Sequence, residues 1–331
     1  EWVGERGVVT ATELARIPEG ARPDAAEADR RLIHALPVSY AVEGLKGIRN
    51  PVGMHTTDVD VESHVVTGAT SVLDKLLEAV EMADIGVDAL VLEPLASGEA
   101  VLTRDEKKHG AVVVDIGGGT TDVVAYSGGH IFFSTVLPVG GFQFTNDICL
   151  TYNASYPVAE NLKLRYAHTD LHAVRANEEV AFPVVGRSSD LKIPRRDICQ
   201  LSRERAQELA RLVKLKLQEI PIRSLSDMTL VLTGGTSALP GLDQLFRLTL
   251  GTKVRIGIPH GHGLIPDDLR APAFATGVGI LFWAQSHPEA AVSDDAVIRS
   301  QTVSGSGGLV SHLFKQVKNV FPTHLFPVRN S

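Results

Sequence analysis

The chain has 331 residues, of which 32 are basic and 39 acidic, so its formal net charge is −7. Hydrophobic residues make up 44% and charged residues 21%, proportions typical of a soluble globular protein, and the length suits about two domains. The net acidity argues against a protein that binds nucleic acid through charge. With only two cysteines, Cys149 and Cys199, the chain is neither a disulfide scaffold nor a four-cysteine zinc protein.

The first hundred residues predict a mixture of strands and short helices, because apolar runs alternate with Gly and Pro. In chain order, the expected elements are a short helix at 12–17, a strand at 31–42 broken at Pro37, a loop at 44–53, a strand at 59–67, an amphipathic helix at 71–85, a buried strand at 89–92 and a helix at 95–102.

The most informative stretch is a glycine turn at 115–122 (DIGGGTTD), which joins an apolar strand at 111–116 to a second strand at 123–126. Glycines allow φ > 0 and close approach of a ligand, and consecutive backbone N–H groups suit phosphate oxygens. Asp115 and Asp122 can hold Mg²⁺ through water or orient an attacking water. The strand that follows excludes a Walker P-loop and a Rossmann fingerprint, which leaves a plain hairpin as the alternative.

A second apolar strand also ends in a Gly-Gly-Thr turn, and this repetition predicts a two-lobed α/β protein. By itself the second turn, at 234–236, is equally well a tight turn before a helix or a place for adenine or ribose. The expected elements after the first turn are strands at 131–137, 229–233 and 254–258 and helices at 159–166, 203–220, 242–249 and 272–284.

The C-terminal part changes character. Residues 286–308 have the composition of a flexible linker, and 309–321 follow a helical apolar spacing with Lys but no acid on the other face. A basic amphipathic helix behind a linker predicts an in-plane membrane anchor, and docking on the protein's own core is the alternative. The predicted membrane-binding residues are Leu309, Val310, Leu313, Phe314, Lys315, Val317, Lys318, Val320 and Phe321.

Several motifs resemble a known superfamily. DIGGGTTD, AENLK (159–163), LTGGTSALPG (232–241) and PAFATGVGIL (272–281) occur in the order found in the actin, Hsp70 and sugar-kinase ATPases. A more specific resemblance is to the FtsA family of bacterial cell-division proteins, over roughly residues 31–286. It is carried by GIRNPVG (47–53), residues 101–129, LPVGGFQFTNDI (137–148), PRRDICQLSRERAQEL (194–209) and KVRIGIP (253–259).

The resemblance implies an actin-like ATPase fold of two lobes with ribonuclease-H-like subdomains and an FtsA-type inserted small subdomain. The implied parts are 1–62 (inserted subdomain), 63–109 (rest of the first large subdomain), 110–150 and 228–285 (second large subdomain), 151–227 (small subdomain of the second lobe), 286–308 (linker), 309–321 (membrane helix) and 322–331 (no interpretation). Because no Asp-x-Gly-Thr loop precedes Arg31 and no Met begins the chain, we expect an N-terminal truncation and weak ATP binding without the upstream segment.

The resemblance also implies roles for individual residues, with ATP and Mg²⁺ as ligands. Glu93 would orient water in catalysis, although a solvated carboxylate at a helix start is an equal alternative. Asp115 would hold Mg²⁺ through water and Asp122 would support it. The remaining implied nucleotide contacts are Gly117, Gly118, Gly119, Thr120 and Thr121 (phosphate), Glu160 and Lys163 (ribose), and Gly234, Gly235 and Thr236 (adenosine).

The function implied is that of a scaffold with at most slow ATPase activity, and not of a metabolic enzyme. Such a protein self-associates on the cytoplasmic face of the cell membrane, at the division septum. There it binds anionic lipid and the FtsZ C-terminal tail, and it recruits later divisome proteins; nucleic acid is not an expected partner. An actin-like pilus-assembly ATPase and a sugar kinase or phosphatase of the same superfamily are the alternatives.

Overall fold

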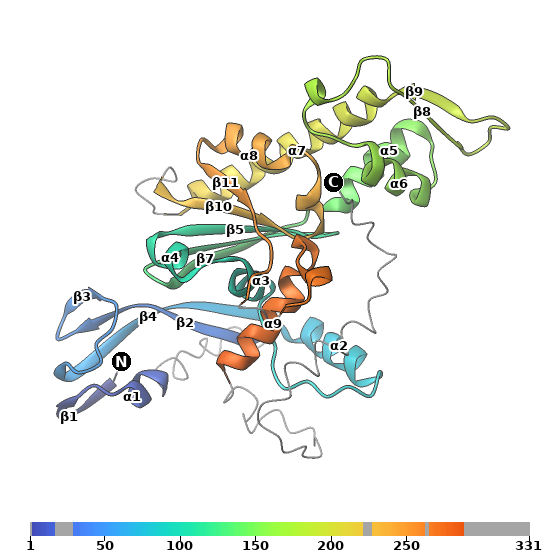
Figure 1. The fold of residues 1–331 in the computed structure, drawn as a ribbon. Coiled ribbons are helices and arrows are strands. Elements are labelled where there is room, and N and C mark those ends of the chain that lie inside the picture. Colours follow the sequence, from blue (N-terminus) through green and yellow to red (C-terminus); the bar gives the residue numbers. More distant parts are fainter. Residues whose placement is uncertain (1, 17–28, 221–226, 262–264, 288–331) are drawn as a thin grey trace.

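The computed structural model describes residues 2–16, 29–220, 227–261 and 265–287. These residues form a four-stranded sheet, a central five-stranded sheet with helices on both faces, and a distal lobe of helices with a β-hairpin (Figure 1). The predicted linker and membrane helix at 286–321 lie almost wholly outside the described residues. The subdomain boundaries given above remain a prediction.

The four-stranded sheet is antiparallel and has the order β1-β4-β2-β3. Its elements are β1 (Trp2–Val8), α1 (Ala11–Arg16), β2 (Arg30–Val42), β3 (Leu45–Ile48) and β4 (His55–Ala69). The predicted break at Pro37 is only a register irregularity, because β2 continues through it along β4. The predicted loop at 44–53 contains β3, which pairs with β2.

The segment after this sheet contains α2 (Thr70–Glu81) and then an irregular stretch up to Leu92. The strand predicted at 89–92 is wrong. A strand is stable when neighbouring strands take its backbone hydrogen bonds, and no strand within the described ranges pairs with this segment. The apolar run therefore has no regular secondary structure.

The central sheet has the order β11-β10-β5-β6-β7. Its strands are β5 (Ala111–Ile116), β6 (Thr121–Ser127), β7 (His130–Leu137), β10 (Thr229–Thr233) and β11 (Lys253–Ile256). β11, β10 and β5 are parallel, so their carboxyl ends meet at one edge of the sheet. All six residues of β5 are buried, as expected for a strand that is covered on both faces.

Two pairs of helices cover the central sheet. α3 (Glu93–Val101) and α9 (Ala275–Ser286) pack on one face, while α7 (Arg195–Gln218) and α8 (Leu242–Leu250) pack on the other (Figure 1). α4 (Arg104–His109) leads into β5. α7 begins eight residues before its predicted start, because Ile198 and Cys199 in its first turns are buried in the distal core.

The distal lobe packs around Ile148, Leu162, Phe182 and Ile198. Its elements are α5 (Gly141–Tyr152), α6 (Tyr156–Tyr166), β8 (Glu179–Phe182), β9 (Leu191–Pro194) and the first half of α7. Short 3₁₀ helices complete the described fold: Leu171–Ala173, Gly235–Ala238, Asp267–Leu269 and Pro272–Phe274. Across the described ranges, none of the helices combines the length and the apolar character that a membrane span requires.

Candidate functional site

The glycine turn lies between β5 and β6 and opens to solvent. The Gly117 N–H donates to the Thr120 carbonyl at 2.9 Å and closes the turn, while Gly118 and Gly119 are exposed. None of the three glycines has a left-handed φ, so the expectation that they supply positive φ is wrong. What they supply is space, because a Cβ built on Gly118 or Gly119 would meet no atom within 4 Å.

One side of the turn is fixed by the start of α5. The N–H groups of Gly141 and Phe142 donate to the carbonyls of Gly117 (2.9 Å) and Gly118 (2.7 Å). This close approach requires a glycine at 140, since a Cβ there would lie 2.8 Å from the Gly118 carbonyl group. Two backbone donors in the first turn of α5 are thus used by the glycine turn itself.

The turn also has backbone donors of its own. Among the residues that the structure describes, the N–H groups of Gly118, Gly119 and Thr120 donate to no protein acceptor. Three consecutive donors without a protein partner form the kind of concavity that binds phosphate oxygens. Gly118 and Gly119 are exposed and Thr120 is half-buried, so this part of the turn is open to a ligand.

The second glycine turn touches the first. Thr233 at the end of β10 pairs with Asp115, and the following Gly234 has a φ of 80°. A Cβ on Gly234 would overlap the Asp115 carboxylate, so only glycine fits there. The Thr236 hydroxyl donates to the Gly117 carbonyl at 2.9 Å. The predicted phosphate and adenosine residues are therefore parts of one cluster, to which Gly235 contributes an exposed backbone.

Glu160 and Lys163 lie on one face of α6, as predicted. The Lys163 ammonium is 2.8 Å from the Glu160 carboxylate and 3.2 Å from the Gly141 carbonyl. The Thr145 hydroxyl donates to Glu160 as well. This pair borders the glycine turn through α5, and its role toward a ribose remains a prediction.

Three carboxylates surround the other edge of the turn. Burial raises the pKa of Asp115 to about 6, although hydrogen bonds from Ser97 and Thr276 oppose the shift. Burial also raises the pKa of Asp122, against a 3.1 Å hydrogen bond from Thr120. The side chain of Glu93, at the start of α3, is exposed. Neighbouring protein atoms, and then the charges of Asp122 and Asp115, raise its pKa to about 7.

This carboxylate cluster is electrostatically unbalanced, since none of Glu93, Asp115 and Asp122 forms an ion pair with another described residue. A divalent cation beside it would lower all three pKa values. Within the described ranges, no three acidic, His or Cys side chains converge as direct metal ligands. A cation would therefore be held largely through water and through the phosphates of a ligand.

Some residues of the site were missed by the sequence analysis. Ser97 and Thr276 donate hydrogen bonds to the Asp115 carboxylate, and the Thr276 hydroxyl is 3.1 Å from it. Thr145 donates to the Glu160 carboxylate. Thr276 lies inside the PAFATGVGIL motif, which contained the signal without indicating which atom it would contact. Thr145 likewise lies inside the LPVGGFQFTNDI motif, whereas Ser97 lies in none of the motifs quoted above.

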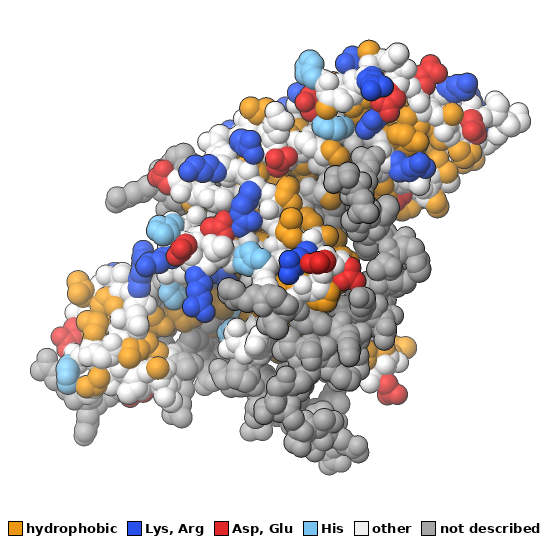
Figure 2. All heavy atoms as spheres, in the orientation of Figure 1, with side chains coloured by type: hydrophobic (Ala, Val, Ile, Leu, Met, Phe, Trp, Pro, Cys, Tyr) orange, Lys and Arg blue, Asp and Glu red, His pale blue; other side chains and the backbone are white. Residues whose placement is uncertain are grey.

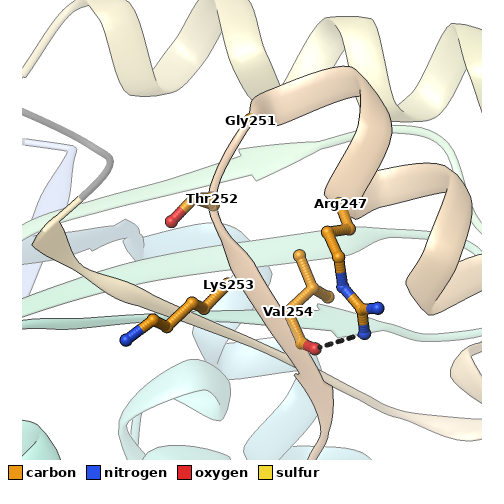
Figure 3. Close-up of a pocket in the computed structure, with 5 residues that line it drawn as sticks. All are labelled: Arg247, Gly251, Thr252, Lys253 and Val254. Carbon is orange, nitrogen blue, oxygen red and sulfur yellow. Dashed lines mark hydrogen bonds between the residues drawn. The ribbon is translucent and has the colours of Figure 1, made fainter.

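A pocket of about 460 Å³ lies elsewhere (Figure 3). It is lined by Arg247, Gly251, Thr252, Lys253 and Val254, and Arg247 donates to the Val254 carbonyl at 3.2 Å. The pocket is at the start of β11. Since β11 runs parallel to β5, it lies at the opposite end of the sheet from the glycine turns and is separate from the site.

Family models decide between the alternatives. The model for "Cell division protein FtsA" matches residues 112–279, and the model for "SHS2 domain inserted in FTSA" matches residues 2–67. The chain belongs to the FtsA family. The predicted family is thus confirmed, and its members are actin-like proteins of cell division.

Individual curated proteins similar to this chain are also FtsA proteins. The cell division protein FtsA of Pseudomonas aeruginosa is 34% identical over 275 residues, which are 83% of this chain and 66% of that protein. The protein of Neisseria meningitidis serogroup B is 30% identical over 316 residues, 95% of this chain and 76% of that protein. This FtsA-family chain therefore spans slightly less than two thirds of the Pseudomonas relative.

Solved structures confirm the predicted actin-like fold. Spiroplasma citri MreB5 bound to ADP has a TM-score of 0.53 at 20% identity, and the match covers 67% of this chain and 68% of that chain. A chain of the PilM–PilN type IV pilus biogenesis complex has a TM-score of 0.56 at 21% identity, with coverage of 84% and 75%. At these identities the likeness concerns the fold alone.

Proposed function

We propose that this FtsA-family chain binds ATP with Mg²⁺ at its paired glycine turns and acts as an actin-like scaffold of the division machinery. The observation that carries the nucleotide proposal is the set of three backbone donors at 118–120, which find no acceptor among the described residues and lie beside three carboxylates. Donors of this kind fit phosphate oxygens, and the carboxylates fit a hydrated cation. The fold neighbour MreB5 has been solved with ADP and with AMPPNP.

The residues of the site would have different roles toward the phosphates, the cation and water. The turn amides and the Thr120 hydroxyl would hold the phosphates, and Asp115 would hold Mg²⁺ through water while Asp122 orients Thr120. When bound, Mg²⁺ supplies positive charge that offsets the carboxylates and the polyphosphate. Glu93 titrates near neutral pH and opens to solvent, so it is suited to orient a water molecule. We expect any hydrolysis to be slow.

The nucleotide-base side of the site would come from the second turn and α6. Gly234, Gly235 and Thr236 offer backbone that a flat base can approach, and Gly235 is exposed. Glu160 and Lys163 are already held by Thr145 and Gly141, so their orientation is set before a ligand arrives. Pre-set polar groups of this kind favour hydrogen bonds to ribose hydroxyls.

Replacing Gly118 by leucine tests the nucleotide site. The side chain would enter open space in front of the turn amides, and Gly118 has no left-handed φ, so we expect the fold to remain intact. Affinity for a fluorescent ATP analogue with Mg²⁺ should fall at least about tenfold. Gly86→Leu is the control, because Gly86 is equally open and lies outside the turn. Equal affinities in the two variants would refute the assignment.

The scaffold proposal rests on family membership and on the described surface. Exposed hydrophobic side chains occur at both ends of the molecule, on the four-stranded sheet and on the distal lobe (Figure 2). They include Val8, Leu45, Val52, Leu150, Leu164 and Val185. Two apolar ends suit head-to-tail contact between copies. We propose self-association through these ends, binding of the FtsZ C-terminal tail, recruitment of later divisome proteins, and location at the septum on the cytoplasmic face of the membrane.

Binding of the FtsZ tail separates this role from that of a pilus-assembly protein or a kinase. The chain should co-sediment with anionic liposomes and should retain a labelled FtsZ C-terminal peptide on them. A scrambled peptide of the same composition is the control. If the chain retains both peptides equally, the tethering role is contradicted.

The lipid contact is proposed for residues 309–321, which lie outside the described residues. Phe314→Glu places a charge on the apolar face of the predicted helix, so the fraction that floats with anionic liposomes should fall several-fold. Ser311→Glu adds the same charge on the polar face and should retain more binding. Undiminished flotation of the Phe314 variant would exclude this segment as the anchor.

A further inference from the structure

His34 in β2 makes a hydrogen bond outside its own sheet. Its Nε2 accepts from the backbone N–H of Leu92 at 3.0 Å, which joins the four-stranded sheet to the residue that precedes α3. The Nε2 must be unprotonated to accept, so the proton of the neutral ring is on Nδ1. Burial, and then the charge of His287, lowers the pKa of His34 to about 4, which keeps the ring neutral at physiological pH.

The end of α9 holds the imidazole in place. Trp283 meets the His34 ring edge-on, with ring centroids 6.0 Å apart. His287 stacks on Trp283 at 4.5 Å and is hydrogen-bonded to the Trp283 carbonyl at 3.0 Å. His34 therefore lies between the four-stranded sheet, the start of α3 and the last turn of α9. A shift of any of these three elements would move its side chain.

Leu92 is the residue through which this contact can act on the site. Its carbonyl accepts from Leu95 (3.0 Å) and Ala96 (3.1 Å), so it sets the first turn of α3. It ends a stretch without regular structure, and its N–H is held by His34. The next residue is Glu93, and the charges of Asp122 and Asp115 interact with its carboxyl group.

We propose that His34 is a positioning residue for Glu93, and that it couples the four-stranded sheet and the end of α9 to the Mg²⁺–nucleotide site. The inference rests on the proposed nucleotide binding. A displacement of β2 would move the Leu92 N–H, and with it the Glu93 carboxyl relative to the carboxylate cluster. Nucleotide binding at the cluster would, conversely, tighten the contact between β2 and α3.

Substitutions at His34 separate positioning from packing. His34→Phe keeps a ring against Trp283 but removes the acceptor, while His34→Gln supplies an amide oxygen that can accept from Leu92. His64→Phe is the matched control, because His64 also joins the two sheets, but its 2.8 Å hydrogen bond is to Ser134 in β7 and not to the start of α3. The measurement is the affinity for a fluorescent ATP analogue with Mg²⁺ between pH 5.5 and 8.5. Glu93→Gln identifies the inflection that belongs to Glu93.

We expect His34→Phe to weaken binding about fivefold and to move the Glu93 inflection by about one pH unit. His34→Gln should restore both, and His64→Phe should change neither. A folded His34→Phe protein with the original inflection would overturn the inference while leaving the proposed function intact. If the unsubstituted chain does not bind the analogue at all, the proposed function itself fails.

Hydrogen exchange of the unsubstituted chain provides a test that no folding defect can obscure. Addition of Mg²⁺ and AMPPNP should slow exchange in peptides that cover Leu92 and His34, together with those that cover the glycine turn. The edge strand β3 should not change. Protection of the glycine turn without protection at His34 and Leu92 would refute the coupling.

Discussion

Replacement of Gly279 by alanine is expected to lower the free energy of unfolding by about 3 kcal/mol. Gly279 lies in α9 where this helix crosses α3, and a Cβ there would overlap the Ala96 carbonyl oxygen. The obstructing atom belongs to the backbone, so no side-chain rotation can relieve the overlap. The two helices would have to separate, and the core shared by α3, α9 and the central sheet would be opened.

Gly277→Ala is the matched control for this prediction. Gly277 lies half a turn away in the same helix, and a Cβ there would meet no atom within 4 Å. Because alanine is the better helix former, this variant should be as stable as the original or more stable by up to about 1 kcal/mol. Urea denaturation of both variants measures the difference. Similar losses in the two would mean that the helix crossing is not the constraint.

The Gly279 variant also bears on the site, because α3 carries both Glu93 and Ser97. If α3 moves away from the sheet, Ser97 can no longer bond Asp115, and Glu93 leaves the carboxylate cluster. Nucleotide affinity should therefore fall along with stability. Added nucleotide should recover part of the lost stability, by mass action.

Local sequence was sufficient where an element depends on its own residues. The strands β5 and β10 were predicted closely because uninterrupted apolar runs end in glycine. The helices α6 and α7 were recognised but start earlier than predicted. In α7 the buried Ile198 and Cys199 account for the earlier start, whereas the first residues of α6, Tyr156 and Pro157, are exposed and its start is marked by the proline in its first turn. Elements that need a partner strand were not predictable: β3 forms because β2 offers its edge, and 89–92 fails to become a strand for lack of one.

In the site, too, contacts between residues close in the chain were predictable and contacts between distant residues were not. The glycine turn and its two aspartates follow each other in the chain, so their proximity needed no knowledge of the fold. The contact of Thr276 with Asp115 joins residues 161 positions apart, and no single sequence indicates such a pairing. Of the two reasons given for the glycines, positive φ was wrong and room for a ligand agrees with the structure. Gly118 and Gly119 leave room for a ligand, whereas the glycine that needs a left-handed φ is Gly234.

Asp115→Asn is expected to stabilise the fold above pH 6. Asp115 is only 2% exposed, and its pKa of about 6 lies above the ordinary value of 3.8. Between these two values the folded state holds a proton that the unfolded state has released, so stability falls as pH rises through this range. Above pH 6 the buried charge destabilises the fold by about 2–3 kcal/mol. Asparagine avoids this loss and still accepts from Thr276.

Chemical denaturation at several pH values tests the sign. The variant should be more stable than the original chain at pH 8, and the difference should vanish below about pH 3, where Asp115 is protonated in both states. Asp147→Asn makes the same chemical change at a carboxylate that is paired with Arg205 at 2.8 Å. That variant should lose about 1 kcal/mol, because an ion pair is broken. A loss at both positions would show that Asp115 does not destabilise the fold.

The ligand should reverse the effect at Asp115. A carboxylate that destabilises the empty fold is useful only if something positive occupies its surroundings, and Mg²⁺ with a nucleotide is the proposed occupant. Addition of Mg²⁺ and AMPPNP should therefore stabilise the original chain more than Asp115→Asn, so that the advantage of the variant at pH 8 shrinks or disappears. If the advantage stays constant in saturating ligand, Asp115 makes no contact with the bound cation, and the carboxylate cluster must have another role.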